Sequence, residues 1–314
     1  MSDFTRRTFM AGTLAAACTP RGARAAGPPA LRLVEVARDL FVAQGRHELF
    51  TAENGGHIAN LSVIIGREAI AVVDTGGSMA AGRALLAAIR ARSDLPVRYV
   101  INTHMHPDHV FGNAAFIEKD TVFVGHSKLP RALAVRGDRY LAANAADLGA
   151  QSFEGTRIVP PTLLVEDRMQ LDLGGRAITL VARKTSHTDN DLTVRDEATG
   201  TLILGDLLFS GHIPTLDGSI RGWIAVLARL EAEQKAARVV PGHGAPSMSW
   251  PEALAPIEHY LGTLAADVRR MIKEGKTLSE ASEAAGFSEK TAWLLFDDYH
   301  RRNVAAAFAE LEWE

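Results

Sequence analysis

The stretch T-H-M-H-P-D-H at residues 103–109 follows the apolar run V-R-Y-V-I-N at residues 97–102. The apolar run predicts a buried strand, and Pro107 prevents that strand from continuing, so the chain should turn into a loop. Four side chains would then surround one point at the carboxyl end of the strand. Imidazole and carboxylate groups bind zinc and similar divalent metals, and a purely structural role seldom requires such a cluster. The stretch therefore predicts a metal site formed by His104, His106, Asp108 and His109.

Three further candidate ligands each follow another apolar, β-rich run. They are His187 after residues 177–182, Asp206 after residues 201–204, and His243 after residues 239–242. Loops held at the ends of strands often carry functional side chains, so we expect all seven candidates to meet along one edge of the fold. Asp206 alone could be a turn residue, but beside the cluster it is better interpreted as a bridging carboxylate. The other histidines are interpreted as structural, with His57 and His212 as the two candidate exceptions.

The order H-x-H-x-D-H, followed by His187, Asp206 and His243, resembles that of the metallo-β-lactamase-fold hydrolase superfamily over roughly residues 30–250. The resemblance implies an α/β fold, a four-layer αβ/βα sandwich with the metals at one edge of its two sheets. It also implies which ligands bind which metal. The first metal would be bound by His104, His106 and His187, the second by Asp108, His109 and His243, and Asp206 would bridge the two.

Several shorter stretches indicate a narrower relation. They are G-G-H-I-A-N at residues 55–60, V-V-D-T-G-G at 72–77, L-G-D-L-L-F at 204–209, H-I-P-T-L-D-G-S-I-R-G-W at 212–223 and the closing E-L-E-W-E. Together they resemble the SoxH-like zinc metallohydrolases of quinoprotein relay systems. This resemblance implies a periplasmic role near quinoprotein dehydrogenases or sulfur-oxidation systems, but it names no substrate.

The expected chemistry follows from two metals that share one water. Bound zinc lowers the pKa of water from about 16 to near 7, which supplies a hydroxide nucleophile without a serine or cysteine. The catalytic residues would be Asp108 and Asp206, which can orient the hydroxide and relay a proton. We therefore expect hydrolysis of an ester, thioester, lactone or amide bond of a small molecule, with two Zn²⁺ ions, although these ligands also accept iron or manganese. Asp74, in V-V-D-T-G, could orient a ligand imidazole or form a strand-end turn.

Single residues and the net charge exclude or disfavour several other functions. Subgroups with a cysteine ligand are excluded because the only cysteine is Cys18. Di-iron electron-transfer members have glutamate where this chain has His106. Net charge −3, from 34 basic and 37 acidic residues, disfavours nucleic acid as a substrate. A single-iron persulfide dioxygenase, a β-lactamase and a non-catalytic periplasmic metal-binding protein remain alternatives.

The first 26 residues predict export. Arg6 and Arg7 lie in T-R-R-T-F-M, ahead of a mildly apolar run at residues 11–17 and an A-R-A site at residues 23–25. This pattern is typical of a twin-arginine signal, and the apolar run is too short for a permanent membrane span. We expect a periplasmic protein with no transmembrane span in the mature chain. Cys18 follows L-A-A-A, a poor lipidation motif, so a lipid anchor there is a weaker alternative.

Residues 251–314 differ from the rest because they contain no convincing strand. Helical segments are predicted at about residues 251–274, 277–285 and 288–312, after earlier helices at residues 78–92 and 222–237. This helical extension should either cover the sandwich of residues 30–250 or pair two subunits in a homodimer. The substrate would be read by the loops near the metals. The candidate residues there are His57, Asn60, His212, Asp217 and Trp223, each of which could instead fix a loop.

Overall fold

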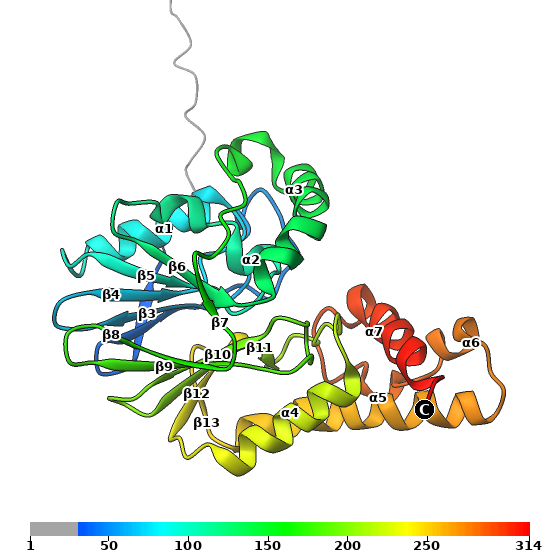
Figure 1. Ribbon diagram of the computed structural model, residues 1–314. Helices are drawn as coiled ribbons and strands as arrows, with labels where there is room; N and C mark the ends of the chain where they lie inside the picture. The colour runs from blue at the N-terminus through cyan, green and yellow to red at the C-terminus, as the bar shows by residue number, and fades with distance from the viewer. Residues whose placement is uncertain (1–30) are drawn as a thin grey trace, which may run out of the picture.

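The computed structural model describes residues 31–314. The predicted export signal and Cys18 therefore lie outside the described residues. Two β-sheets face one another in the described part, and helices cover their outer faces (Figure 1). Among the helices of residues 31–314, none is long and apolar enough to span a membrane.

The first sheet has seven strands in the order β1 to β7. Pairing is antiparallel from β1 to β4 and parallel from β4 to β7. The strands are β1 Leu33–Ala37, β2 Leu40–Ala43, β3 Leu61–Ile65, β4 Ile70–Val73, β5 Val97–Ile101, β6 Val122–His126 and β7 Leu163–Val165. Because β4 and β5 are parallel neighbours, the residues that follow them meet at one edge of the sheet.

The second sheet has six strands in the order β13-β12-β11-β10-β9-β8, in which only β11 and β12 are parallel. The strands are β8 Arg168–Asp172, β9 Ala177–Ala182, β10 Leu192–Asp196, β11 Thr201–Phe209, β12 Arg238–His243 and β13 Met248–Ser249. The predicted run at 201–204 is thus the first half of a longer strand, so Asp206 lies within β11 rather than after it.

Three apolar cores separate the layers. The core between the sheets includes Val42 and Ile64 from the first sheet and Leu180 and Val194 from the second. Helix α1 (Met79–Arg90) covers the first sheet, and α4 (Ile220–Glu233) and α5 (Ala255–Lys273) cover the second (Figure 1). Helix α3 (Leu129–Phe153) packs instead on α1 and on the loop and short helix at residues 105–111. The four-layer αβ/βα sandwich expected from the sequence is confirmed. Helix α3, which α1 contacts, was not anticipated.

The C-terminal helices pack on the second sheet and share one core with it and α4. They are α5, α6 (Leu278–Ser282) and α7 (Phe296–Leu311). A short 3₁₀ turn at Glu252–Leu254 leads into α5, and another at Phe287–Glu289 lies between α6 and α7. The predicted start of the last helix at residue 288 was wrong. Leu294 forms an isolated β-bridge with His212 and Leu295 has a left-handed φ of 58°, so the helix cannot begin before Phe296.

Candidate metal centre

The loop after β5 holds four of the candidate ligands. Pro107 occupies the first position of the short helix α2 (Pro107–Val110), where its missing N–H costs nothing, and this turns the chain directly after His106. Asp108 and His109 follow within the same helical turn. The start of the loop is fixed by Thr103, whose backbone N–H donates to Asp74 Oδ1 at 2.8 Å. The loop therefore brings the four side chains to one end of the sheet, but they divide between two clusters instead of surrounding the single point expected from the sequence.

Three imidazoles form the first cluster. His104 Nε2 lies 3.0 Å from His106 Nδ1, and His187 Nε2 lies 3.3 Å and 3.0 Å from the same two atoms. Tetrahedral zinc with bonds of about 2.0–2.1 Å would separate its nitrogen ligands by roughly 3.3 Å. The spacing of these three nitrogens therefore suits a tetrahedral divalent cation.

Asp108, His109 and His243 form the second cluster. Asp108 Oδ2 lies 3.2 Å from His243 Nε2 and 3.5 Å from His109 Nε2. Asp206 lies between the two clusters, with Oδ1 3.2 Å from His109 Nε2 and Oδ2 3.5 Å from His187 Nε2. The two groups of donor atoms are each compact enough to hold one ion.

Gly205 explains how a residue inside a strand reaches this position. Its φ of +53° coincides with a register shift between β11 and β12, as in a bulge that redirects the next side chain. A side chain at Gly205 would also collide with Thr103, because an added Cβ would lie 2.7 Å from the Thr103 Cβ. The glycine therefore lets β11 approach the loop and direct Asp206 toward both clusters.

The outward nitrogen of each imidazole has its own acceptor. His187 Nδ1 donates to the Thr215 carbonyl (2.6 Å), His243 Nδ1 to the Ile58 carbonyl (3.0 Å), His109 Nδ1 to Asp74 (2.8 Å), His106 Nε2 to Asp217 (3.2 Å) and His104 Nδ1 to the Thr103 hydroxyl (3.0 Å). A hydrogen on the outward nitrogen leaves a lone pair on the inward one. In the neutral form of the five imidazoles, their lone pairs therefore converge, an arrangement that a cation would stabilise. Within residues 31–314, His109 Nε2 and Asp206 Oδ1 are buried without any hydrogen-bond partner, which fits metal ligation.

The electrostatics of the two clusters differ. Burial lowers the pKa of His187 to about 3 and that of His104 well below its usual value, so both imidazoles are neutral, the form in which histidine can bind a metal. Burial alone would also lower the pKa of His243, but the carboxylates of Asp206 and Asp108 raise it to about 9. The buried carboxylates thus require nearby positive charge, which divalent cations would supply.

A loop at residues 213–219 orients two ligands, and the C-terminal helix α7 holds this loop. The loop supplies the Thr215 carbonyl to His187 and the Asp217 carboxylate to His106. Asn303 of α7 donates to the Pro214 carbonyl at 2.6 Å and accepts from the Leu216 N–H at 2.8 Å. The helical extension is therefore connected to the first cluster by two steps of hydrogen bonding, a connection that sequence spacing does not indicate.

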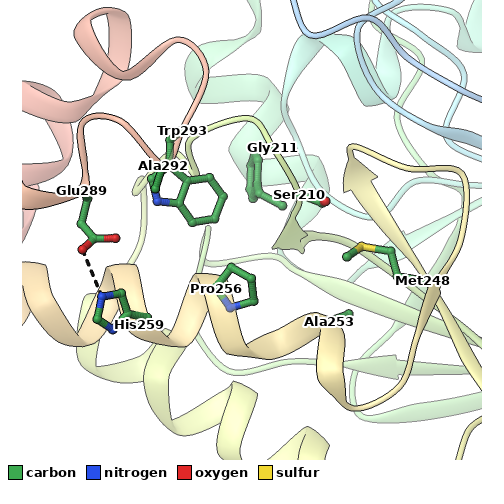
Figure 2. A pocket seen from close by; sticks show the side chains of 10 residues that line it. Ser210, Gly211, Met248, Ala253, Pro256, His259, Glu289, Ala292 and Trp293 are labelled. Carbon is green, nitrogen blue, oxygen red and sulfur yellow. Dashed lines mark ion pairs between the residues drawn. The ribbon is translucent and has the colours of Figure 1, made fainter.

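Phe209 separates a neighbouring cavity from the ligands. Figure 2 shows this cavity between the end of β11 and helix α5, with Met248, Pro256 and Trp293 in its lining. Its volume is about 270 Å³. Phe209 also lines it, and the Phe209 ring stacks on His243 with centroids 5.0 Å apart. None of the lining residues is a candidate ligand, so this cavity is separate from the two clusters.

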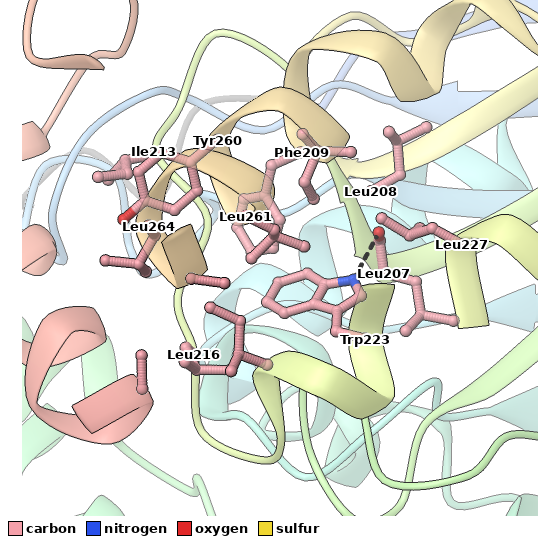
Figure 3. Packing of buried hydrophobic residues seen from close by; sticks show 14 of the residues in the cluster. Leu207, Leu208, Phe209, Ile213, Leu216, Trp223, Leu227, Tyr260, Leu261 and Leu264 are labelled. Carbon is pink, nitrogen blue, oxygen red and sulfur yellow. Dashed lines mark hydrogen bonds between the residues drawn. The ribbon is translucent and has the colours of Figure 1, made fainter. Parts of the chain in front are cut away.

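Two of the five candidate substrate residues have structural contacts instead. Trp223 is fully buried in the core of Figure 3, where its indole N–H donates to the Leu207 carbonyl at 3.1 Å and its ring packs against His187. The expectation that Trp223 contacts substrate was wrong, because no part of it reaches solvent. The amide of Asn60 accepts from the Gly45 N–H and donates to the Pro241 carbonyl, so it fixes a loop beside β12.

The other three candidate substrate residues are His212, Asp217 and His57, and they differ in whether they contact the candidate ligands. His212 is buried and stacks on His243 with centroids 5.0 Å apart, while its Nδ1 donates to the Ile213 carbonyl. Asp217 contacts His106 from the side away from the first cluster. His57 is buried, and its Nε2 has no hydrogen-bond partner among residues 31–314. Of these three, Asp217 and His212 contact a candidate ligand directly.

The fold and the two ligand clusters define a metallo-hydrolase. The family model of the metallo-beta-lactamase superfamily matches residues 54–243, more than half of the chain, and the chain belongs to that superfamily. A linear primary-alkylsulfatase from Pseudomonas sp. (strain ATCC 19151) is 39% identical over 62 residues, which are 20% of this chain and 12% of the relative. The chain thus matches only a small part of that relative's length.

Solved structures share the fold at low identity. The sec-alkylsulfatase Pisa1 from Pseudomonas sp. is 16% identical with a TM-score of 0.68, and the match covers 88% of this chain and 50% of that one. A metallo-beta-lactamase from Pontibacter korlensis is 19% identical with a TM-score of 0.59, covering 74% of this chain and 99% of that one. Both confirm the architecture.

Proposed function

We propose that this protein binds two divalent metal ions, zinc in its native state, and hydrolyses an ester, thioester, lactone or amide bond of a small molecule. The observation that carries the proposal is the position of Asp206 between two clusters of inward-facing ligand atoms. His104, His106 and His187 would hold one ion, and Asp108, His109 and His243 the other. Such ions lower the pKa of bound water to near 7 and polarise the bond under attack.

The two carboxylates have distinct places in this proposal. Asp206 has a side chain only 3% exposed and would hold both ions in register. Asp108 is more open, with a side chain 10% exposed, and it borders His243. A carboxylate in that position can accept a proton from the nucleophile and return it to the leaving group, so Asp108 is our candidate proton carrier.

An alkyl sulfate is a second candidate substrate. The support is the 39% identity over 62 residues with a protein described as a linear primary-alkylsulfatase. Sulfate esters and carboxylic esters both place a polarisable oxygen beside the leaving group, so the same pair of ions would serve either reaction.

Metal analysis of the purified protein, followed by a substrate screen, tests the proposal. The screen would contain chromogenic carboxylic esters, thioesters, lactones, an alkyl sulfate and a cephalosporin. Two zinc ions per chain with turnover of one class would support it. One iron per chain with oxygen consumption on a persulfide would overturn it in favour of a dioxygenase. Two ions without turnover of any class would favour a metal-binding protein.

We also propose export to the periplasm by the twin-arginine pathway, directed by residues 1–26. The support is the sequence pattern around Arg6 and Arg7. The double variant Arg6→Lys, Arg7→Lys should retain the protein in the cytoplasm of its host, whereas periplasmic recovery of the variant would overturn the proposal. A homodimer through the helices of residues 251–314 is a separate proposal, for which light scattering of the purified protein would report the mass.

A further inference from the structure

Two arginines from distant parts of the chain converge on Asp217 beside the first cluster. Arg136 lies on α3 and contacts Asp217 Oδ2, and Arg302 lies on α7 with Nη2 3.4 Å from Asp217 Oδ1. The same carboxylate accepts from His106 Nε2 at 3.2 Å. Asp217 therefore links the two guanidinium groups to His106, a candidate metal ligand.

The charges in this group do not balance. One carboxylate faces two guanidinium groups, and the imidazole of His106 would be neutral as a metal ligand. The side chains of Arg136 and Arg302 are 41% and 59% exposed, whereas that of Asp217 is 13% exposed. A surplus positive charge with unused N–H donors thus faces solvent next to the metal centre.

Another ion pair in the protein serves as a comparison, because its role is purely structural. Arg176 and Asp196 form a one-to-one pair with side chains 8% and 0% exposed, and Arg176 also donates to the Arg38 and Ile65 carbonyls. That guanidinium is buried and its donors are used within the protein. The guanidinium groups at Asp217 are open instead, and exposed ion pairs contribute little to stability.

We propose that Arg136 and Arg302 bind an anionic group of the substrate, a carboxylate or similar oxyanion remote from the bond that is cleaved. The inference rests on the proposed function, because it places that bond at the metal centre. Guanidinium groups suit planar or tetrahedral oxyanions because they can donate two parallel hydrogen bonds.

Tyr140 extends the same surface. Its ring lies 6.3 Å from that of His106, and its hydroxyl accepts from Arg136 Nη1 at 3.4 Å. Burial raises the pKa of Tyr140, so the phenol keeps its proton. The hydroxyl can therefore donate to the same anionic group.

Two esters that differ only at the end remote from the bond test the proposal. Mono-4-nitrophenyl glutarate carries a terminal carboxylate, and 4-nitrophenyl pentanoate carries a methyl group in its place. For Arg136→Gln and Arg302→Gln we expect kcat/KM for the glutarate ester to fall about tenfold, the loss of one charge-assisted contact. The pentanoate ester should change less than about twofold, and the metal content should stay constant.

Arg301→Gln is the matched control, since Arg301 neighbours Arg302 on α7 but pairs with Glu283. This variant should leave kcat/KM for both esters unchanged. An equal loss for both esters in the Arg136 and Arg302 variants would overturn the proposal, because the arginines would then act only through Asp217 and His106. Arginine variants with the same kcat/KM as the native protein for both esters would overturn the proposal as well.

Binding of glutarate itself, measured by calorimetry, separates this proposal from the proposed function. Weaker glutarate binding in both arginine variants, with no turnover of any class in the substrate screen by the two-metal protein, would refute the hydrolase and retain the anion site. Glutarate binding that is the same in the native protein and both variants would refute the anion site even if the hydrolase stands.

Discussion

The Asp74 carboxylate accepts a hydrogen bond from Nδ1 of His109 at 2.8 Å, and this bond joins the end of β4 to the second cluster. Asp74 also receives the Thr103 N–H and hydroxyl, both at 2.8 Å. Its φ is +62°, so it turns the chain at the end of the strand as well. The two interpretations that its sequence left open, an outer partner of a ligand and a strand-end turn, are both true.

Asp74→Asn should weaken binding of the second metal. Asparagine tolerates the left-handed backbone, so the turn should survive, but the negative charge behind His109 is lost. Loss of such an outer partner weakens metal binding by about 10- to 100-fold. Competition with a chromogenic chelator would measure the change, with the exposed Asp167→Asn as control. Unchanged affinity for both ions would contradict this role.

Asp206→Ala should abolish most of the turnover, because it removes the one carboxylate that lies between the clusters. We expect kcat to fall on the order of a thousandfold, which corresponds to about 4 kcal/mol of activation free energy. Metal content should fall below that of the native protein. The exposed Asp94→Ala should match the native protein in both measurements, and thermal unfolding in chelator would verify that the variant folds. Near-native turnover would exclude a bridging role.

Asn303→Ala should affect stability and the first metal together. The change leaves the buried Leu216 N–H and Pro214 carbonyl without partners, which should lower the free energy of unfolding by about 3 kcal/mol. The loop that orients His106 and His187 should loosen, and we expect affinity for one of the two ions to fall about tenfold. Urea unfolding and equilibrium dialysis would report the two effects. Glu312→Gln, exposed just beyond α7, is the control; a loss of stability with intact metal affinity would show that the helix does not act on the centre.

His57 should make stability depend on pH below 6.5. Burial lowers the pKa of folded His57 to about 4, from an unfolded value near 6.5. Between these values the unfolded chain binds the proton and the folded chain does not, so stability falls as pH falls from 6.5 toward 4. The expected loss is about 2 kcal/mol at pH 5. His57→Gln should reduce this slope, while the exposed His259→Gln should not; parallel slopes for all three proteins in urea unfolding would refute the assignment.

Much of the architecture was predictable from local pattern. The strand at residues 97–101 and the helix at 79–90 follow from apolar periodicity, and Ser78 caps that helix as its residue type suggests. Helix α3 was missed because its charged and apolar residues do not separate into clear faces, and Gly149 interrupts it with a φ of 76°. The start of α7 was misplaced because Leu295 adopts a left-handed conformation that its residue type does not announce.

The candidate ligand types and their order could be read from the amino-acid sequence, because metal coordination demands particular side chains and the spacing around Pro107 places four of them in one loop. How these side chains are held in place depends on the assembled fold. The acceptors behind His187 and His243 are backbone carbonyls, which carry no side-chain signature, and Asn303 lies 87 residues from the Leu216 N–H that it binds. The meeting of Arg136 and Arg302 at Asp217 likewise depends on the packing of α3 on α1 and α2 and of α7 on α4, α5 and α6, since contacts between distant segments form only when the layers assemble.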